Sequence, residues 1–258
     1  MSRDIPDDRR LTKAERKEQA RQEREALQRR LASRRRRNRI GVGLVASGVA
    51  VAAFTFFVSP EEGGIPGPDG LLARASQAAS SAGCTDVQTT PPFEPADQDR
   101  QHVGGGALGA PPLSAYATTP PASGPHADVT LPAGVYDTLS LEEFYRSIHS
   151  LEHGASIVWY DPTAPAERIA GVLDFYDRRL QDASVGQDRV IVAPYDFAGQ
   201  GDGLLPEGQD LALVAWHRLR SCAELDLAVA YDFTSQYSFP TSSDRDYAGE
   251  APEPGAAL

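Results

Sequence analysis

The chain lacks the residues and motifs on which several common enzyme chemistries depend. Its only lysines are Lys13 and Lys17, so almost the whole chain has no lysine to act as a base or a Schiff-base nucleophile. It also has no Gly-x-Ser-x-Gly sequence, no phosphate-binding loop and no dinucleotide-binding fingerprint. The two cysteines, Cys84 and Cys222, do not form a Cys-x-x-Cys pair, which gives no support to redox catalysis.

Charged residues are absent from one long run, residues 40–59. At a rise of roughly 1.5 Å per residue, a helix of this length spans the roughly 30 Å hydrocarbon core of a bilayer. The alternative is a buried helix of a globular core. Such a helix normally keeps a polar stripe, and this run has only Ser47, Thr55 and Ser59. We therefore expect a transmembrane helix over residues 40–59.

The charges on the two sides of this run are opposite in sign. Residues 1–39 contain 15 Lys and Arg against 7 Asp and Glu, whereas the residues after 59 contain 10 against 29. Because positive charge stays on the cytoplasmic side, we expect a single-pass signal anchor in the cell membrane, with the amino end inside and the remainder outside. A cleavable signal peptide fits less well, since its apolar run normally has only about 7–15 residues.

Residues 1–39 form a basic segment whose composition predicts a helix from about residue 11. Its arginines next to the span are expected to contact the anionic headgroups of the lipid bilayer. Topology and lipid charge explain this run sufficiently, so we do not expect nucleic-acid binding. The arginines are Arg34, Arg35, Arg36, Arg37 and Arg39.

Composition divides the rest of the chain into three parts. Residues 60–83 begin with a Pro- and Gly-rich spacer and are interpreted as a linker, and residues 241–258 are an acidic tail that we expect to be disordered. Between them we expect one domain, residues 84–240, with its compact core at 126–240. The Pro- and Gly-rich stretch 86–125 is either extended chain wrapped on this core or partly disordered.

Apolar periodicity predicts the elements of the core. Ser140 and Glu143 form a capping-box signature before a helix that ends at Gly154. The predicted fold class is α+β, a small two-layer α/β sandwich with the helices over one face of a sheet. The predicted strands are 155–160, 189–195 and 211–220, and the other predicted helices are 169–180 and 224–237.

Both cysteines follow the predicted span. In an oxidising compartment, a disulfide between Cys84 and Cys222 is the leading interpretation. It would attach the amino-terminal arm of the domain to the end of the third predicted strand. The alternative is a pair of free thiols.

Histidines cluster between residues 102 and 153. His149 and His153 are four residues apart on a predicted helix, so both imidazoles lie on one face at a spacing that suits a shared metal ion. With Glu152 they fit the His-x-x-Glu-His pattern of inverted zinc peptidases, in which the glutamate activates water. The alternatives are a bound metal without hydrolysis and a structural role, in which a histidine caps the carboxyl end of the helix.

The other histidines differ in their surroundings. His126 ends the turn-forming string Pro-Pro-Ala-Ser-Gly-Pro-His, whose rigidity would fix its imidazole, unless it is simply a solvated loop residue. His102 lies in a Gly-rich arm and is a candidate additional ligand. His217 shares a predicted strand face with apolar residues and is interpreted as a core histidine. The candidate ligands of a divalent transition metal, Zn, Cu or Ni, are His102, His126, His149 and His153.

The ordered series of motifs resembles a known family. The motifs are the string at 120–126, His-Ser-Leu-Glu-His-Gly with Ile-Val-Trp-Tyr at 149–160, Val-Ala-Pro-Tyr at 192–195 and Ala-Trp at 215–216. Over about 84–240 the chain is similar to the domain of unknown function 3105 family, bacterial membrane-anchored proteins common in actinobacteria. The resemblance implies an extracytoplasmic domain with His102 on an arm, and it supplies no activity. His217 departs from it, because the family usually has a glycine there.

Together these features predict a membrane-anchored extracytoplasmic protein, more readily a binding protein than an enzyme. The preferred function is a binding or envelope-associated module with a histidine-rich metal site. The alternatives are a metal-dependent hydrolase with Glu152 as its general base, and a structural protein that interacts with another envelope protein.

Overall fold

The computed structural model describes residues 65–258 except 105–108, 182–188 and 241–245. All of these belong to one compact unit, Glu61–Leu258. The predicted basic segment 1–39 and the predicted span 40–59 lie outside the described residues. Within the described part, no helix combines the length and the hydropathy needed to cross a membrane.

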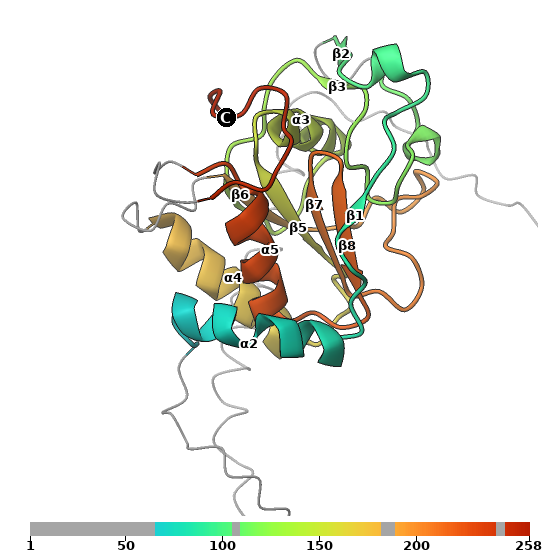
Figure 1. Ribbon diagram of the computed structural model, residues 1–258. Coiled ribbons are helices and arrows are strands. Elements are labelled where there is room, and N and C mark those ends of the chain that lie inside the picture. The colour runs from blue at the N-terminus through green and yellow to red at the C-terminus, as the bar shows by residue number, and fades with distance from the viewer. Residues whose placement is uncertain (1–64, 105–108, 182–188, 241–245) are drawn as a thin grey trace, which may run out of the picture. The chain divides into compact units, whose positions relative to one another are not determined.

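A six-stranded mixed sheet forms the centre of the described chain (Figure 1). Its strands are β1 (Gln88–Thr89), β4 (Gly134–Val135), β5 (Ser156–Tyr160), β6 (Val190–Pro194), β7 (Leu211–Ala215) and β8 (Arg218–Cys222). The strand order is β1-β8-β7-β5-β6-β4. β5 pairs in parallel with β6 and antiparallel with β7, so the type of pairing changes in the middle of the sheet.

Helices cover both faces of this sheet (Figure 1). The α-helices of the described part are α2 (Pro68–Ser81), α3 (Leu141–Glu152), α4 (Ala166–Gln181) and α5 (Leu227–Tyr237). α2, α4 and α5 pack on the face that carries Val158 and Tyr160, whereas α3 packs on the face that carries Ile157 and Trp159. The predicted α+β class is confirmed, but the two-layer arrangement with helices over one face is wrong.

The composition of the central strands explains this difference. Every residue of β5, β6 and β7 is buried. A strand with one solvated face alternates apolar and polar residues, whereas a strand covered on both faces is apolar throughout. β6, with the sequence Val-Ile-Val-Ala-Pro, shows no alternation, and this unbroken apolar run is the signal for two covered faces.

The signals at the two ends of α3 are confirmed. Ser140 Oγ accepts a hydrogen bond from Glu143 N (3.2 Å), and the Glu143 carboxylate accepts one from Ser140 N (2.7 Å), which completes the capping box. Gly154 follows the helix with a φ of 89°, a left-handed conformation that favours glycine. The elements predicted at 155–160, 169–180, 189–195 and 224–237 correspond to β5, α4, β6 and α5.

The predicted third strand, 211–220, is wrong as a single element. It is an antiparallel hairpin of β7 and β8, which turns at Trp216 and His217. His217 therefore does not lie on a strand face, and its φ of 54° is in the left-handed region. Glycine adopts this conformation without strain, whereas other residues rarely adopt it.

The predicted linker 60–83 is wrong from residue 68 onward, because Pro68–Ser81 form α2. Proline is favoured in the first turn of a helix, where its missing N–H has no intrahelical partner to lose. Leu71 is completely buried and Ala75 is 5% exposed, so α2 belongs to the core. Pro68, which was counted as part of the predicted spacer, is the first residue of a helix.

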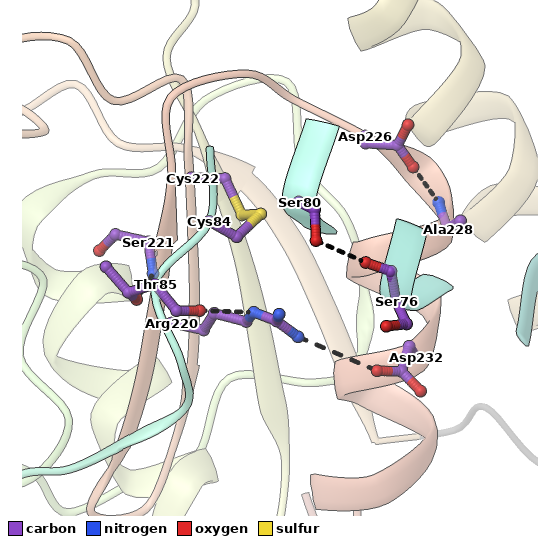
Figure 2. The surroundings of a disulfide bond; sticks show 10 residues. All are labelled: Ser76, Ser80, Cys84, Thr85, Arg220, Ser221, Cys222, Asp226, Ala228 and Asp232. Atoms are coloured by element: carbon purple, nitrogen blue, oxygen red, sulfur yellow. Dashed lines mark hydrogen bonds and ion pairs between the residues drawn. A yellow bond between two sulfur atoms is a disulfide. The ribbon is translucent and has the colours of Figure 1, made fainter. Parts of the chain in front are cut away.

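The predicted disulfide between Cys84 and Cys222 is confirmed, and Cys84 lies shortly after the end of α2 (Figure 2). Next to it, Arg220 Nε donates a hydrogen bond to the carbonyl oxygen of Thr85 (3.0 Å). The Arg220 guanidinium also lies 4.0 Å from the carboxylate of Asp232 in α5. The disulfide thus ties the amino-terminal arm to β8, and Arg220 links both to α5.

The described parts of the stretch 86–125 are extended chain and short 3-10 helices (Ala96–Gln98 and Leu113–Ala115) packed on the core. Phe93 and Tyr116 are 6% and 7% exposed, and they belong to the same apolar cluster as α3. Of the two alternatives for this stretch, the wrapped chain is therefore correct for the described residues.

The prediction of a disordered tail is wrong for residues 246–258, the part of the tail that the structure describes. Glu253 N donates to Glu152 O (3.0 Å) and Gly255 N donates to His153 O (3.2 Å). The last carbonyl groups of a helix have no intrahelical partner, and these tail amides provide one at the end of α3.

Candidate metal centre

The last turn of α3 carries His149 and Glu152 into the interior, where they are 6% and 1% exposed. Residues three apart on a helix are neighbours on one face. The Ser150 hydroxyl accepts from Leu131 N (2.9 Å) and donates to Leu131 O (2.7 Å), which holds the preceding loop on this turn. His149 Nδ1 lies 2.8 Å from the carbonyl oxygen of Ala127 in that loop.

His102 and His126 come from the extended arm. They lie opposite each other on two short parallel strands, β2 (His102–Val103) and β3 (His126–Ala127), and β3 packs against α3 (Figure 1). His126 is completely buried, whereas the side chain of His102 is 50% exposed. The group is therefore deep at His126 and open to solvent at His102.

These two parts of the chain bring four potential metal ligands together. One ligand atom of each residue lies within 4.8 Å of those of the other three. Glu152 Oε2 is 3.0 Å from His126 Nε2 and 3.6 Å from His102 Nε2. The members of this histidine cluster are His102, His126, His149 and Glu152.

Backbone carbonyls decide which nitrogen of each buried imidazole is free. A carbonyl oxygen only accepts hydrogen bonds, so Nδ1 of His126 donates to Gly124 O (2.7 Å) and Nδ1 of His149 donates to Ala127 O (2.8 Å). The Nε2 atom of each neutral ring then keeps its lone pair for the cluster. This is the usual arrangement of metal-binding histidines, whose second nitrogen is hydrogen-bonded to the protein.

Arg100 compensates the charge of the buried Glu152 carboxylate. Its Nε donates to Glu152 Oε1, and its Nη2 donates to Glu253 in the tail (2.6 Å). Burial by itself raises the pKa of Glu152, but the hydrogen bonds and charges of His126, when its ring is protonated, and of Arg100 outweigh burial and lower the pKa to about 2. Glu152 is therefore an anion at neutral pH.

His149 is neutral at the same pH. Burial disfavours its charged form, and repulsion from His126, His153 and His102 adds to this effect, so its pKa falls to about 4. A neutral imidazole and an ionised carboxylate are the forms in which these side chains bind metal ions.

His153 lies beside the cluster and outside the group of four. Its Nε2 is 3.2 Å from His149 Nε2, while its Nδ1 donates to Ala257 O in the tail (2.6 Å). Around a helix, residues three and four positions beyond His149 fall about 60° to one side and about 40° to the other. The deeper side carries Glu152, which the sequence suggested as a general base only in the hydrolase alternative, and the outer side carries His153.

His217 was predicted to be a core histidine. It instead lies in the β7–β8 turn, where it contacts Asp99 of the extended arm. Its Nε2 lies 2.8 Å from Asp99 Oδ2, and its side chain is 23% exposed. Asp99 Oδ1 accepts from Phe93 N and Ser123 Oγ, both at 2.6 Å. Asp99 thus links the segments that precede β2 and β3, and it positions His102 and His126 without contacting either.

Sequence reasoning missed Arg100, Asp99 and Glu253. A signal existed for Arg100, because no other Arg or Lys occurs between Arg74 and Arg146. A lone cation two residues before a candidate ligand indicates an anionic partner. Nothing in the sequence connects Glu253, in the acidic tail, with the end of α3.

Fold and site together define an α+β domain with a buried cluster of histidines and one glutamate. The family model described as Protein of unknown function (DUF3105) matches residues 113–255, more than half of the chain. The chain therefore belongs to this family, as the motifs predicted. The matched region ends at residue 255, further into the tail than the resemblance over about 84–240. It includes His126, His149 and Glu152 and begins after Arg100 and His102. No curated protein and no solved structure matches the chain.

Proposed function

We propose that this domain binds one divalent transition-metal ion through His102, His126, His149 and Glu152. The contact between His126 Nε2 and Glu152 Oε2 carries the proposal. The two atoms are buried 3.0 Å apart, and apart from this contact neither has a hydrogen-bond partner. Both are acceptors when His126 is neutral. A cation between them would satisfy both. A proton on His126 Nε2 would give a hydrogen bond to Glu152 and nothing more. A metal ion would bind both of these atoms and also the free Nε2 lone pair of His149.

The donor set suits Zn, Cu or Ni. Three imidazoles and one carboxylate, without a thiolate, are ligands that these ions share. In this arrangement Glu152 is a ligand, because one of its oxygens lies in the cluster and the other accepts from Arg100. A carboxylate with a pKa of about 2 is also a weak general base. The geometry supports a binding site over a hydrolase.

Metal analysis of the purified full chain tests the proposal. The chain is stripped with a chelator, dialysed separately against Zn²⁺, Cu²⁺ and Ni²⁺, and analysed for metal content. We expect one ion per chain, and much less in His149→Ala. Glu142→Gln is the control, because Glu142 is exposed on the same helix as His149 and lies outside the cluster. If the wild-type chain retains no stoichiometric ion, the metal site does not exist.

The location of the domain is the second part of the proposal. The uncharged run 40–59 and the charge difference across it support a single-pass anchor in the cell membrane with the carboxyl domain outside. The disulfide between Cys84 and Cys222 agrees with an oxidising compartment. Alkaline phosphatase fused after residue 258 should be active, since it needs an oxidising compartment, and a fusion before residue 40 should be inactive. The reverse result would overturn the orientation.

The arginines before the run are proposed to set this orientation and to contact anionic headgroups. Replacing Arg34, Arg35, Arg36, Arg37 and Arg39 with Gln removes five positive charges next to the run. We expect part of the population to insert in the opposite orientation, measured as a loss of phosphatase activity from the carboxyl-terminal fusion. Unchanged activity would assign the orientation to other residues.

A further inference from the structure

A second pair of potential metal ligands, His153 and Glu253, lies beside the histidine cluster. His153 is the residue after α3, and Glu253 belongs to the tail that packs on the end of this helix. His153 Nε2 lies 3.2 Å from His149 Nε2 and 3.6 Å from Glu253 Oε2. The other oxygen of Glu253 accepts from Arg100 Nη2 (2.6 Å), so Arg100 holds both Glu253 and Glu152.

The hydrogen bonds of these histidines leave two lone pairs facing each other. Nδ1 of His149 donates to Ala127 O (2.8 Å), and Nδ1 of His153 donates to Ala257 O (2.6 Å). When both rings are neutral, both Nε2 atoms are acceptors, yet they are only 3.2 Å apart. This contact requires a proton or a metal ion.

The spacing suits a metal ion. With metal–nitrogen bonds of about 2.0 Å, two ligands of a tetrahedral ion lie about 3.3 Å apart. The side chains of His153 and Glu253 are 12% and 49% exposed, whereas those of His126 and Glu152 are 0% and 1% exposed. An ion at His153 would therefore lie closer to the edge of the molecule than an ion at His126.

We propose that His149, His153 and Glu253 form an outer metal position beside an inner position made of His102, His126, His149 and Glu152. The inference rests on the proposed function, because both positions take the same class of ion and share His149. His149 Nε2 has one lone pair, so the two positions are occupied in turn and the chain holds one ion at a time.

Zinc titration of the full chain with ¹⁵N-labelled imidazoles distinguishes the two positions. The chain has five histidines, so the spectrum is simple, and an Nε2 atom that binds zinc changes its chemical shift. In the wild type, one equivalent should shift Nε2 of His102, His126 and His149 and leave His153 free. In His126→Ala, zinc should shift His149 and His153 instead, with an affinity lower by at least the roughly 10- to 100-fold that loss of an outer-shell partner costs.

The double variant His126→Ala/His153→Ala should bind no zinc at the concentrations that fill His126→Ala. The control His126→Ala/Glu142→Gln should bind zinc as His126→Ala does, because Glu142 is exposed and lies outside both positions. Because His126 is completely buried, Glu152→Gln replaces His126→Ala as the inner variant if circular dichroism shows that the latter does not fold.

The outcomes for the two proposals differ. The outer position is refuted if zinc binds the inner variant without shifting His153, or if His153→Ala leaves that binding undiminished, while the wild type still binds zinc through the inner ligands. A wild-type chain that takes up no zinc refutes the proposed function and the outer position together.

Discussion

Glu152→Gln tests the inner ligand set with the smallest change of shape. The amide keeps the volume of the side chain but removes the negative charge that lies 3.0 Å from His126 Nε2 and pairs with Arg100. An ion that binds the folded chain and not the unfolded chain stabilises the fold by RT ln(1 + [metal]/Kd). The loss of a ligand should therefore appear as a loss of metal-dependent stability.

The expected size follows from this relation. At a free zinc concentration of about 100 times the wild-type Kd, the ion adds about 2.7 kcal/mol to the free energy of unfolding. Loss of an outer-shell partner can raise Kd about 100-fold, and loss of a charged ligand should raise it at least as much, so the same concentration adds at most about 0.4 kcal/mol to the variant. For a domain of this size each kcal/mol is worth about 2–4 °C, so zinc should raise the Tm by about 5–11 °C in the wild type and by about 1 °C in the variant.

Thermal unfolding followed by circular dichroism, with and without zinc, measures both shifts. Glu142→Gln is the matched control, because Glu142 is exposed on the same helix and lies outside the cluster. It should show the wild-type shift. An equal shift in the wild type and in Glu152→Gln would refute Glu152 as a ligand, and the absence of a shift in every chain would refute the zinc site.

Two further predictions concern the scaffold, and a third concerns the protonation of His149. Reducing the disulfide opens a cross-link across 138 residues, for which chain entropy predicts a loss of at most about 5 kcal/mol, measured by urea titration with and without reductant. Asp99→Ala removes a buried acceptor shared by Phe93, Ser123 and His217, so the same titration should show a loss of about 2–4 kcal/mol in the free energy of unfolding. Zinc affinity should also fall, because the arm that carries His102 and His126 is released. Unchanged zinc affinity would contradict the positioning role of Asp99. The metal-free chain should lose stability as the pH falls from about 6.5 towards about 4, because unfolded His149 takes up a proton in this range while the folded residue, with its pKa at about 4, does not. If denaturant titrations show the same pH dependence in His149→Gln, another group causes it.

The elements that could be predicted from the sequence are those whose signals are local. Ser140, Glu143 and Gly154 fix both ends of α3, and their effects act within one or two turns of the helix. The turn at His217 has no glycine, so β7 and β8 read as one strand although the chain reverses there. The number of helices on each face depends on packing between distant segments, and only the unbroken apolar sequences of the strands indicate it.

The candidate site could be predicted only in part, for the same reason. The spacing of His149 and His153 is local, and their Nε2 atoms do lie 3.2 Å apart. The inner position instead depends on the parallel register that places His102 opposite His126, and no local pattern encodes that register. It also depends on the rotation of α3, which turns Glu152 towards His126 and His153 towards the tail. The two hydrogen bonds between Ser150 and Leu131 hold the last turn in this orientation. Because the same His-x-x-Glu-His sequence would present the second histidine if the helix were rotated by about 100°, the pattern alone does not decide whether the glutamate is a ligand or a base.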